Sequence, residues 1–301
     1  MRQNQTSGAT NMTLKNTPPS SEFSIVDSHQ HFWQLSRGDY KWLSPQLGVL
    51  YKDYLPEHLH AEVDCYHVKQ TVLVQAAATE EETHFLLRLA YDTNFVAGVV
   101  GWINFEDINA VSRLEQLAAS HYLKGVRPML QDIEDPAWIL NPEFTAIFNV
   151  MENAGLTLDA LVRDVHLYSI ETLAKRHPDL KIVIDHCAKP DLTAVPSALW
   201  QQRLANIAKC TNVHIKFSGL MTESPKGEVS VNDIRAVFEL ILNAFGPDRI
   251  MWGSDWPVVN LNGSYDEWFA LSQTLLNDLP EVAQKKIWGL NAQKFYCLTS
   301  V

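Results

Sequence analysis

Short apolar runs rich in β-branched residues alternate along this chain with longer segments of helical periodicity, beginning at Ser24. This alternation favours a parallel sheet whose strands are joined by crossover helices. Eight of the apolar runs predict strands: SIVDSH, QTVLVQA, FVAGVVGW, YLKGVR, LTLDALV, LKIVIDH, NVHIKFSG and RIMWGSD. The pattern therefore predicts an α/β fold.

Helix starts can be recognised between these runs. Thr79 and Glu82 form a capping box ahead of HFLLRLAYD, and Ser264 and Glu267 form another ahead of FALSQTLL. Asn141, which is followed by a proline, predicts a further helix start. These signals support the alternation of strands and helices.

Eight strand–helix units are compatible with a (β/α)8 TIM barrel or with a doubly wound open sheet. Polar residues at the downstream ends of the predicted strands favour the barrel: His31, Arg127, His186 and Asp255. In a barrel these ends converge on one face, whereas an open sheet would keep the first and last strands apart. We therefore predict a single-domain (β/α)8 barrel over residues 23–301.

The first 22 residues have a different composition, rich in Gln, Asn, Ser and Thr and ending in PPSSE. They contain no apolar run long enough for a signal peptide, and residues 1–22 are predicted to be a flexible tail. Nowhere does the chain contain the roughly 18 uninterrupted apolar residues of a membrane helix. We expect a soluble protein.

Charge and cysteine content narrow the class of partner. With 35 acidic and 24 basic residues the net charge is -11, which disfavours nucleic acid and anionic membranes as partners. The four cysteines are widely spaced without a CxxC motif, as is typical of reduced thiols in the cytoplasm. A small neutral or weakly charged substrate fits this composition better.

The segment SIVDSHQHFW contains a His-x-His pair, His29 and His31. Alternate side chains of a strand share a face, so the two imidazoles are expected to point the same way. Neutral imidazole is the commonest metal ligand. Two later segments, IVIDHCAKP with His186 and IMWGSDWPV with Asp255, add polar groups of the same kind.

Taken in order, DSHQHFW, LVQAAATEEETHFLL, KGVRPMLQD, HPDLKIVIDHCAKP, KFSGLMTE and MWGSDWPV resemble the amidohydrolase superfamily. Within it they are most similar to the sugar-lactone hydrolases related to L-fuconolactonase and L-rhamnonolactonase. The resemblance covers the chain from about Ser24 to its end. It implies site positions on five strands: His29 and His31 on the first, Arg127 on the fourth, His186 on the sixth, Lys216 on the seventh, and Asp255, which activates the attacking water, on the eighth.

Two positions depart from the binuclear members of that superfamily. Where those members carry a bridging lysine or acidic residue near strand four, this chain has Arg127. Where they place a histidine at the end of strand five, it offers Asp159, with His166 only further on. The resemblance therefore implies a single divalent ion, zinc in first place, held by His29, His31 and Asp255. Metal-independent hydrolysis is the alternative.

The chemistry of lactone hydrolysis can be assigned to these residues directly. A lactone is an activated ester, so its hydrolysis needs a base for water and an electrophile for the developing oxyanion. Asp255 is the predicted base, and His186 and Arg127, or a metal on the histidine pair, are the predicted electrophiles. The chain has no G-x-S-x-G elbow, since Ser254 lacks the flanking pattern, and direct attack by water is the simpler mechanism.

Aromatic and basic residues near these motifs are candidates for substrate binding. Trp33 and Trp256 are predicted to face the sugar ring, and Trp42 is predicted to pack in the core. For Lys216 a place in the site and an ion pair with a barrel carboxylate are equally compatible with the sequence.

Three classes of function remain at this stage. The first is hydrolysis of a sugar lactone, and the second is metal-dependent decarboxylation or another hydrolysis, as of a muconolactone, within the superfamily. The third is a non-catalytic barrel, in which His186 with Asp185 would be a core pair and Asp255 would begin a turn before Pro257. The oligomeric state is open, with a homo-oligomer as one alternative.

Overall fold

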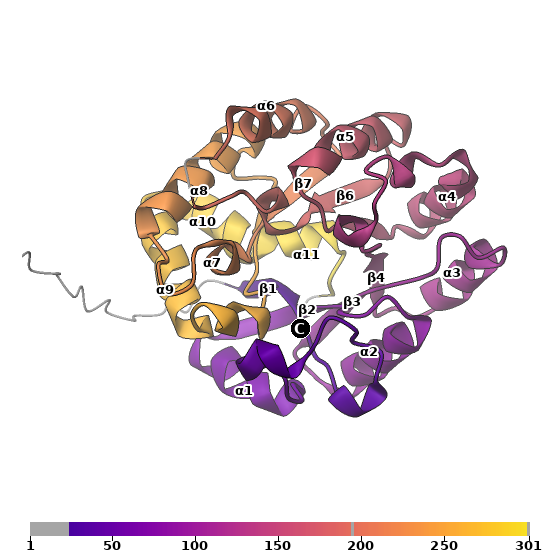
Figure 1. Ribbon diagram of the computed structural model, residues 1–301, viewed down its shortest axis with the longest axis horizontal. Helices are drawn as coiled ribbons and strands as arrows, with labels where there is room; N and C mark the ends of the chain where they lie inside the picture. Colours follow the sequence, from indigo (N-terminus) through magenta and orange to yellow (C-terminus); the bar gives the residue numbers. More distant parts are fainter. Residues whose placement is uncertain (1–23, 194–195, 300–301) are drawn as a thin grey trace, which may run out of the picture.

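The computed structural model describes residues 24–193 and 196–299, and this part of the chain forms the predicted barrel of eight parallel strands with helices around it (Figure 1). The predicted tail, residues 1–22, lies outside the described residues. The strands are β1 Ile25–Gln30, β2 Val68–Val74, β3 Val96–Gly101, β4 Leu123–Val126, β5 Thr157–Ala160, β6 Lys181–Ile184, β7 Val213–Phe217 and β8 Ile250–Trp252. Each overlaps one of the predicted runs.

Contacts just beyond β8 join the last strand to the first. The backbone N–H of Asp255 donates to the carbonyl of His29 at 2.8 Å, and that of His31 donates to the carbonyl of Trp256 at 2.7 Å. The carboxylate of Asp27 accepts the N–H of Ser254 at 2.8 Å. These bonds bring the two ends of the strand order together, which an open sheet would not do.

Helices surround the strands, most of them on the outside of the barrel (Figure 1). They are α1 Pro56–Cys65, α2 Glu80–Asp92, α3 Ala110–Ala118, α4 Thr145–Ala154, α5 Leu167–Arg176, α6 Ala198–Ile207, α7 Leu220–Glu223, α8 Val231–Phe245, α9 Tyr265–Leu276, α10 Glu281–Lys285 and α11 Asn291–Phe295. Within the described residues, no helix combines the length and apolar character needed to cross a membrane.

All three predicted helix starts are capped by a side-chain oxygen, and at Asn141 the side-chain oxygen accepts the N–H of Glu143 at 3.1 Å. The hydroxyl of Thr79 accepts the N–H of Glu82 at 3.1 Å, and that of Ser264 accepts the N–H of Glu267 at 3.2 Å. The carboxyl group of Glu82 does not return to Thr79 as a capping box requires; it accepts the N–H groups of Ala76 and Ala77 instead. It thereby fixes the loop after β2.

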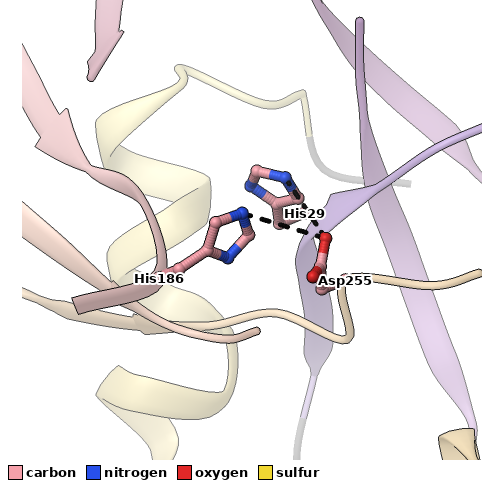
Figure 2. Close-up of side chains that lie close together, drawn as sticks. All are labelled: His29, His186 and Asp255. Carbon is pink, nitrogen blue, oxygen red and sulfur yellow. Dashed lines mark ion pairs between the residues drawn. The ribbon is translucent and has the colours of Figure 1, made fainter. Parts of the chain in front are cut away.

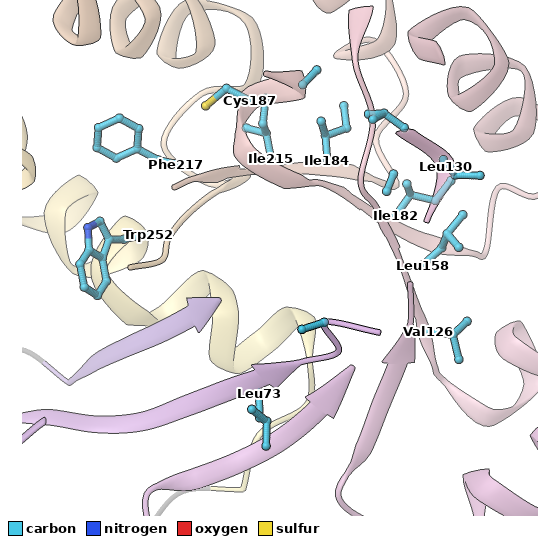
Figure 3. Packing of buried hydrophobic residues seen from close by; sticks show 14 of the residues in the cluster. Leu73, Val126, Leu130, Leu158, Ile182, Ile184, Cys187, Ile215, Phe217 and Trp252 are labelled. Atoms are coloured by element: carbon cyan, nitrogen blue, oxygen red, sulfur yellow. The ribbon is translucent and has the colours of Figure 1, made fainter. Parts of the chain in front are cut away.

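Alternate residues of the strands belong to two different apolar layers. One layer points outward to the helices, as Figure 3 shows for Leu73, Val126, Leu158, Ile184 and Phe217. The other layer includes Val26, Val72, Val74, Val100, Val183 and Met251, which pack with Ala292, Phe295 and Tyr296 of the C-terminal segment. Helix α11 therefore closes the barrel at the end opposite the carboxyl ends of the strands, and the site is free to form at the carboxyl ends.

Candidate active site

Three side chains from widely separated strands meet at the carboxyl end of the barrel: His29 in β1, His186 after β6 and Asp255 after β8 (Figure 2). The Asp255 carboxylate oxygen Oδ1 lies 3.8 Å from the Nε2 atoms of both imidazoles. His31 adds a third imidazole, with its Nε2 at 3.3 Å from the same oxygen. One buried carboxylate therefore faces three imidazoles.

Hydrogen bonds orient the two histidines of the His-x-His pair. His31 donates through Nδ1 to the carbonyl of Val74 at 2.7 Å, which leaves its Nε2 without a proton in the neutral ring. That Nε2 lies 3.2 Å from Nε2 of His29. On the other side of the His29 ring, Nδ1 is 3.1 Å from Nζ of Lys216 and 3.4 Å from a carboxylate oxygen of Asp185. The two Nε2 atoms thus point to one place, as the spacing predicted.

Left-handed backbone places the other two members of the cluster. Asp255 has φ 57°, and a run of four residues from His186 to Lys189 has φ between 50° and 58°. Such angles are unfavourable for residues other than glycine and concentrate at functional sites. At Gly219 a Cβ atom would collide with the His186 ring, so only glycine fits there. The hydroxyl of Ser218 lies 3.0 Å from Nδ1 of His186 and holds the ring in place.

A buried network of charges lies directly beneath the cluster. The Lys216 ammonium group contacts carboxylate oxygens of Asp159 at 2.6 Å and of Asp185 at 3.1 Å, and none of these side chains is exposed. Arg127 contacts Asp185 at 3.1 Å, and the hydroxyl of Tyr296 donates to Asp159 at 2.6 Å. Two cations therefore balance two carboxylates below the imidazoles.

The charges in this network set the protonation of its carboxyl groups. Burial raises the pKa of Asp185, but Lys216 and His29 outweigh burial and hold that pKa well below its usual range. Burial also raises the pKa of Asp159, and here Lys216 offsets only part of the rise. Of the two carboxyl groups, Asp185 is thus the firmly ionised one, and it carries the negative charge that faces His29.

The cluster itself holds an ionised carboxylate beside a neutral imidazole. Burial raises the pKa of Asp255, but His186, followed by the other imidazoles, outweighs burial and holds the pKa well below the usual range. Burial lowers the pKa of His186 to about 4. At neutral pH, Asp255 can therefore accept a proton, and His186 can donate a hydrogen bond through its N–H.

A pocket of about 230 Å³ opens over this cluster. Four of its lining residues carry the predicted chemistry: His31, Arg127, His186 and Asp255. The other lining residues are Trp42, Ala76, Met129, Gln131, Asp132, Leu161, Lys189, Thr222 and Val258. The loops after most of the strands therefore contribute to one pocket at the carboxyl end of the barrel.

The tryptophans are arranged differently from the prediction. Trp33 is fully buried, donates through its indole N–H to the carbonyl of Lys52 at 2.8 Å, and packs edge-on against Trp42. Trp256 is 3 % exposed and lines a different pocket. Trp42, predicted to pack in the core, is 38 % exposed and lines the pocket over the cluster. The indoles of Trp33 and Trp256, next to the strand ends, fill the space beneath the loops. The pocket is lined instead by Trp42, which lies in a loop.

Of the two alternatives that the sequence allows for Lys216, substrate contact or an ion pair with a barrel carboxylate, the structure shows the ion pair. Its side chain is fully buried under His29 and is absent from the lining of the pocket. Asp159 occupies the inner position of β5, and Lys216 compensates its charge. His166, the later histidine, accepts the N–H of Arg163 at 3.2 Å in a short 3-10 helix and does not line the pocket over the cluster.

The cluster fits a small divalent cation. Tetrahedral zinc with Zn–N bonds of about 2.0–2.1 Å places its ligand atoms about 3.4 Å apart. The corresponding separations are 3.2 Å for His29 to His31, 3.3 Å for His31 to Asp255 and 3.8 Å for His29 to Asp255. His186 and Asp255 also belong, with His29, to a group of potential ligand atoms that lie within 4.8 Å of one another. Sequence and structure therefore point to the same ligand types.

Sequence reasoning missed several residues that support the site. The sequence predicts for Asp185 only a core pair with His186, whereas the structure places it in contact with Lys216, Arg127 and His29. Gln75 donates to the backbone carbonyl of Arg127 at 2.8 Å, and the only available signal was a polar residue ending an apolar strand. Tyr296 gave no signal, because its partner Asp159 is 137 positions away.

Similarity to known proteins covers nearly all of the barrel. The Amidohydrolase family model matches residues 26–298. The chain is 37% identical over 275 residues to an L-fucono-1,5-lactonase of Burkholderia ambifaria, which covers 90% of this chain and 94% of that relative. An L-rhamnono-gamma-lactonase of Scheffersomyces stipitis is 27% identical over 201 residues, 58% of this chain and 59% of its own. A solved zinc-bound amidohydrolase from Burkholderia multivorans has a TM-score of 0.86 and 34% identity, over 91% of this chain and 99% of that one.

Proposed function

Because the chain belongs to the amidohydrolase family, we propose that it is a hydrolase that opens a sugar lactone to the corresponding hydroxy acid. The observation that carries this proposal is that the ionised Asp255 carboxylate faces three imidazoles, two of which, His31 and His186, line the pocket with it. The chain is also 37% identical to an L-fucono-1,5-lactonase. That relative makes L-fucono-1,5-lactone the first substrate to test.

The pocket suits a single sugar ring. Sites for drug-sized ligands usually enclose about 300–1,000 Å³. At about 230 Å³ the pocket over the cluster is smaller than this range. Trp42 offers an aromatic face, and Gln131 and Asp132 offer polar atoms for hydroxyl groups. These residues replace Trp33, Trp256 and Lys216 as the proposed substrate contacts.

Asp255 acts as the general base in this proposal. Its carboxylate accepts a proton from water as the water oxygen attacks the lactone carbonyl carbon. The acyl carbon–oxygen bond of the ring then breaks, and the proton passes from Asp255 to the departing ring oxygen, which becomes a hydroxyl. A carboxylate with a lowered pKa is a weak base, so the reaction depends on strong stabilisation of the oxyanion.

His186 and Arg127 are the proposed sources of that stabilisation. If Ser218 donates to Nδ1, the neutral His186 ring carries its proton on Nε2, on the side that faces Asp255. Arg127 lines the same pocket, while its two terminal nitrogens are bound by Asp185 and Gln75. We therefore assign the direct hydrogen bond to His186, and to Arg127 a fixed positive charge near the carbonyl oxygen.

One divalent ion, zinc in first place, is assigned to His29, His31 and Asp255, with His186 next to them. When bound, it supplies Lewis-acid assistance to the deprotonation of water and to the developing negative charge. We expect about one equivalent of metal per chain by elemental analysis, and its loss in His29→Ala and His31→Ala. Full activity after chelation, with no bound metal remaining, would instead establish the metal-independent alternative.

The state of the cysteines is consistent with a reducing compartment. All four cysteines, Cys65, Cys187, Cys210 and Cys297, are free thiols. Free cysteines are typical of proteins that work in the cytoplasm. We accordingly place the enzyme there.

The test of the function is a pH-indicator assay of acid release from L-fucono-, L-rhamnono-, L-arabinono- and D-galactonolactones, corrected for spontaneous opening. General acid–base catalysis contributes about 10²–10⁴-fold, so we expect Asp255→Asn to lose that factor in kcat with an unchanged circular dichroism spectrum. Asp92→Asn, at an exposed helical aspartate, is the matched control and should retain the wild-type rate.

Two results would contradict the proposal. If wild-type protein opens none of the lactones, sugar lactones are excluded as its substrates. Release of carbon dioxide from an aromatic carboxylic acid in a parallel assay would then favour decarboxylation. An Asp255→Asn variant within tenfold of the wild-type kcat would leave lactone hydrolysis in place but remove Asp255 as its base.

A further inference from the structure

A second pocket, of about 560 Å³, adjoins the one over the imidazole cluster. The two pockets share Trp42, Ala76, Met129 and Asp132 in their linings, so they lie side by side. The second pocket receives none of the cluster residues, and it is built from the loops that follow β1, β2, β3 and β4. The loop after β3 contributes residues 102–106 to this pocket and none to the pocket over the cluster.

Aromatic rings dominate one part of this pocket. Trp42, Trp102, Phe105 and Trp138 all line it. The Trp138 ring is held by its indole N–H, which donates to Glu106 at 2.7 Å, and by packing against Phe105 with ring centres 5.7 Å apart. Fixed aromatic faces of this kind can stack on the C–H face of a sugar ring, because those hydrogens carry partial positive charge and the ring face is negative.

Carboxylates lie among the aromatic rings. Asp39, Glu106 and Asp132 line the pocket together with Asn104 and Lys41. In Asp39, one oxygen accepts from Arg37 at 2.5 Å and from Thr79 at 2.9 Å, whereas the other, Oδ1, is buried without a hydrogen-bond partner among the described residues. A buried carboxylate oxygen without a donor is costly, and the carboxylates of the lining can accept hydrogen bonds from the hydroxyl groups of a sugar.

We infer that this pocket is a subsite for a second sugar ring attached to the lactone, so that the physiological substrate is a glycosylated aldonolactone. This inference rests on the proposed function. The shared lining supports a covalently attached ring, because a substituent on a lactone bound over the cluster would lie next to the second pocket, at Trp42 and Met129. The combination of aromatic faces with carboxylate acceptors favours a sugar over a purely apolar group.

The experiment compares lactones that differ only in the second ring. Disaccharides with L-fucose at the reducing end, linked at each ring hydroxyl in turn, are oxidised to their lactones, and their opening is compared with that of L-fucono-1,5-lactone. We expect at least one linkage to raise kcat/KM by about tenfold or more, since a tenfold gain corresponds to about 1.4 kcal/mol. An O-benzyl lactone serves as the apolar comparison.

Trp102 is the residue to vary, because it lines only the second pocket and lies outside the one over the cluster. Its backbone N–H and carbonyl bind the hydroxyl of Thr83, so a side-chain substitution leaves those bonds in place. Trp102→Ala should abolish the advantage of the glycosylated lactone and leave opening of the simple lactone unchanged. Trp102→Phe, which keeps an aromatic face, should retain most of the advantage.

The outcomes separate this inference from the proposed function. If wild-type protein opens no lactone at all, the function itself fails. If it opens the simple lactone but gains nothing from any linked sugar, the subsite is overturned, whatever the variants do. An equal gain from the O-benzyl group, or a sugar advantage that survives in Trp102→Ala, would likewise overturn a sugar subsite at this place.

Discussion

The buried ammonium group of Lys216 allows a quantitative test of how the site is held. Lys216→Met keeps the length and apolar part of the side chain but removes the charge that lies 2.6 Å from Asp159 and 3.1 Å from Asp185. Removal of one partner of a buried ion pair usually costs about 3–5 kcal/mol, because the remaining charge is left uncompensated. We expect a loss of free energy of unfolding in that range.

The structure also indicates how the loss is divided between the two carboxylates. Asp185 keeps Arg127 at 3.1 Å, whereas Asp159 loses the one cation that contacts it among the described residues and retains the hydroxyl of Tyr296. Burial already raises the pKa of Asp159, so this carboxyl group should take up a proton in Lys216→Met. A second substitution, Asp159→Asn, removes that cost, and the double variant should be at least as stable as Lys216→Met alone.

The assay is urea unfolding followed by circular dichroism and tryptophan fluorescence for wild type, the two single variants and the double variant. Coupling between contacting residues usually amounts to about 0.5–3 kcal/mol, which this cycle can resolve. The matched control is Lys175→Met, which removes an exposed i,i+4 ion pair with Glu171 and should cost about 0.5 kcal/mol or less.

A small effect would refute the reasoning. If Lys216→Met cost no more than Lys175→Met, the buried network would not stabilise the barrel. If the effects of Lys216→Met and Asp159→Asn were additive, the two residues would act independently despite the 2.6 Å contact.

Three further predictions concern other parts of the molecule. Burial raises the pKa of Glu82 from 4.5 to about 8, so the stability that this group contributes is complete below pH 4.5 and is lost as pH rises through about 8. In urea unfolding between pH 5 and 9, the free energy of unfolding of wild type should therefore fall by at least about 1.4 kcal/mol more than that of Glu82→Gln. Equal decreases in the two proteins would refute this. Ser218→Ala frees Nδ1 of His186 and should lower kcat about tenfold and change its pH profile, with partial rescue by Ser218→Thr; an unchanged profile would exclude this orienting role. Trp33→Ala should cost about 3–5 kcal/mol in stability, whereas Trp42→Ala should mainly raise KM, and the reverse pattern would restore the sequence prediction.

The barrel could be predicted from the sequence because local and global signals agree. Each apolar run became a strand, and the polar residues at the strand ends distinguished the barrel from an open sheet. Strand ends were less predictable, since β8 ends at Trp252 while the predicted run continued to Asp255. There the backbone leaves the strand to adopt the left-handed conformation at Asp255, which no local pattern indicated.

Within the site, residues whose chemistry is tied to a strand end were predictable. His29 and His31 share a face because of strand geometry, and the structure brings both to Asp255. Residues whose role depends on a distant partner were not. Nothing near Lys216 in the sequence indicates whether it faces the pocket or lies beneath it, because that depends on Asp159 and Asp185 from other strands.

The same argument explains the exchange of roles between Trp33 and Trp42. A tryptophan next to a strand end lies where the barrel wall meets its loops, and the Trp33 indole satisfies its N–H there with the carbonyl of Lys52. Trp42 lies nine positions further along, in a loop that returns over the barrel, and its N–H donates to the carbonyl of Ala76 at 2.7 Å. That bond connects the loop after β1 to the loop after β2 and sets the Trp42 ring at the junction of the two pockets. The proposed substrate contacts in this barrel therefore depend on interactions between loops, whereas the proposed catalytic groups depend on the strands.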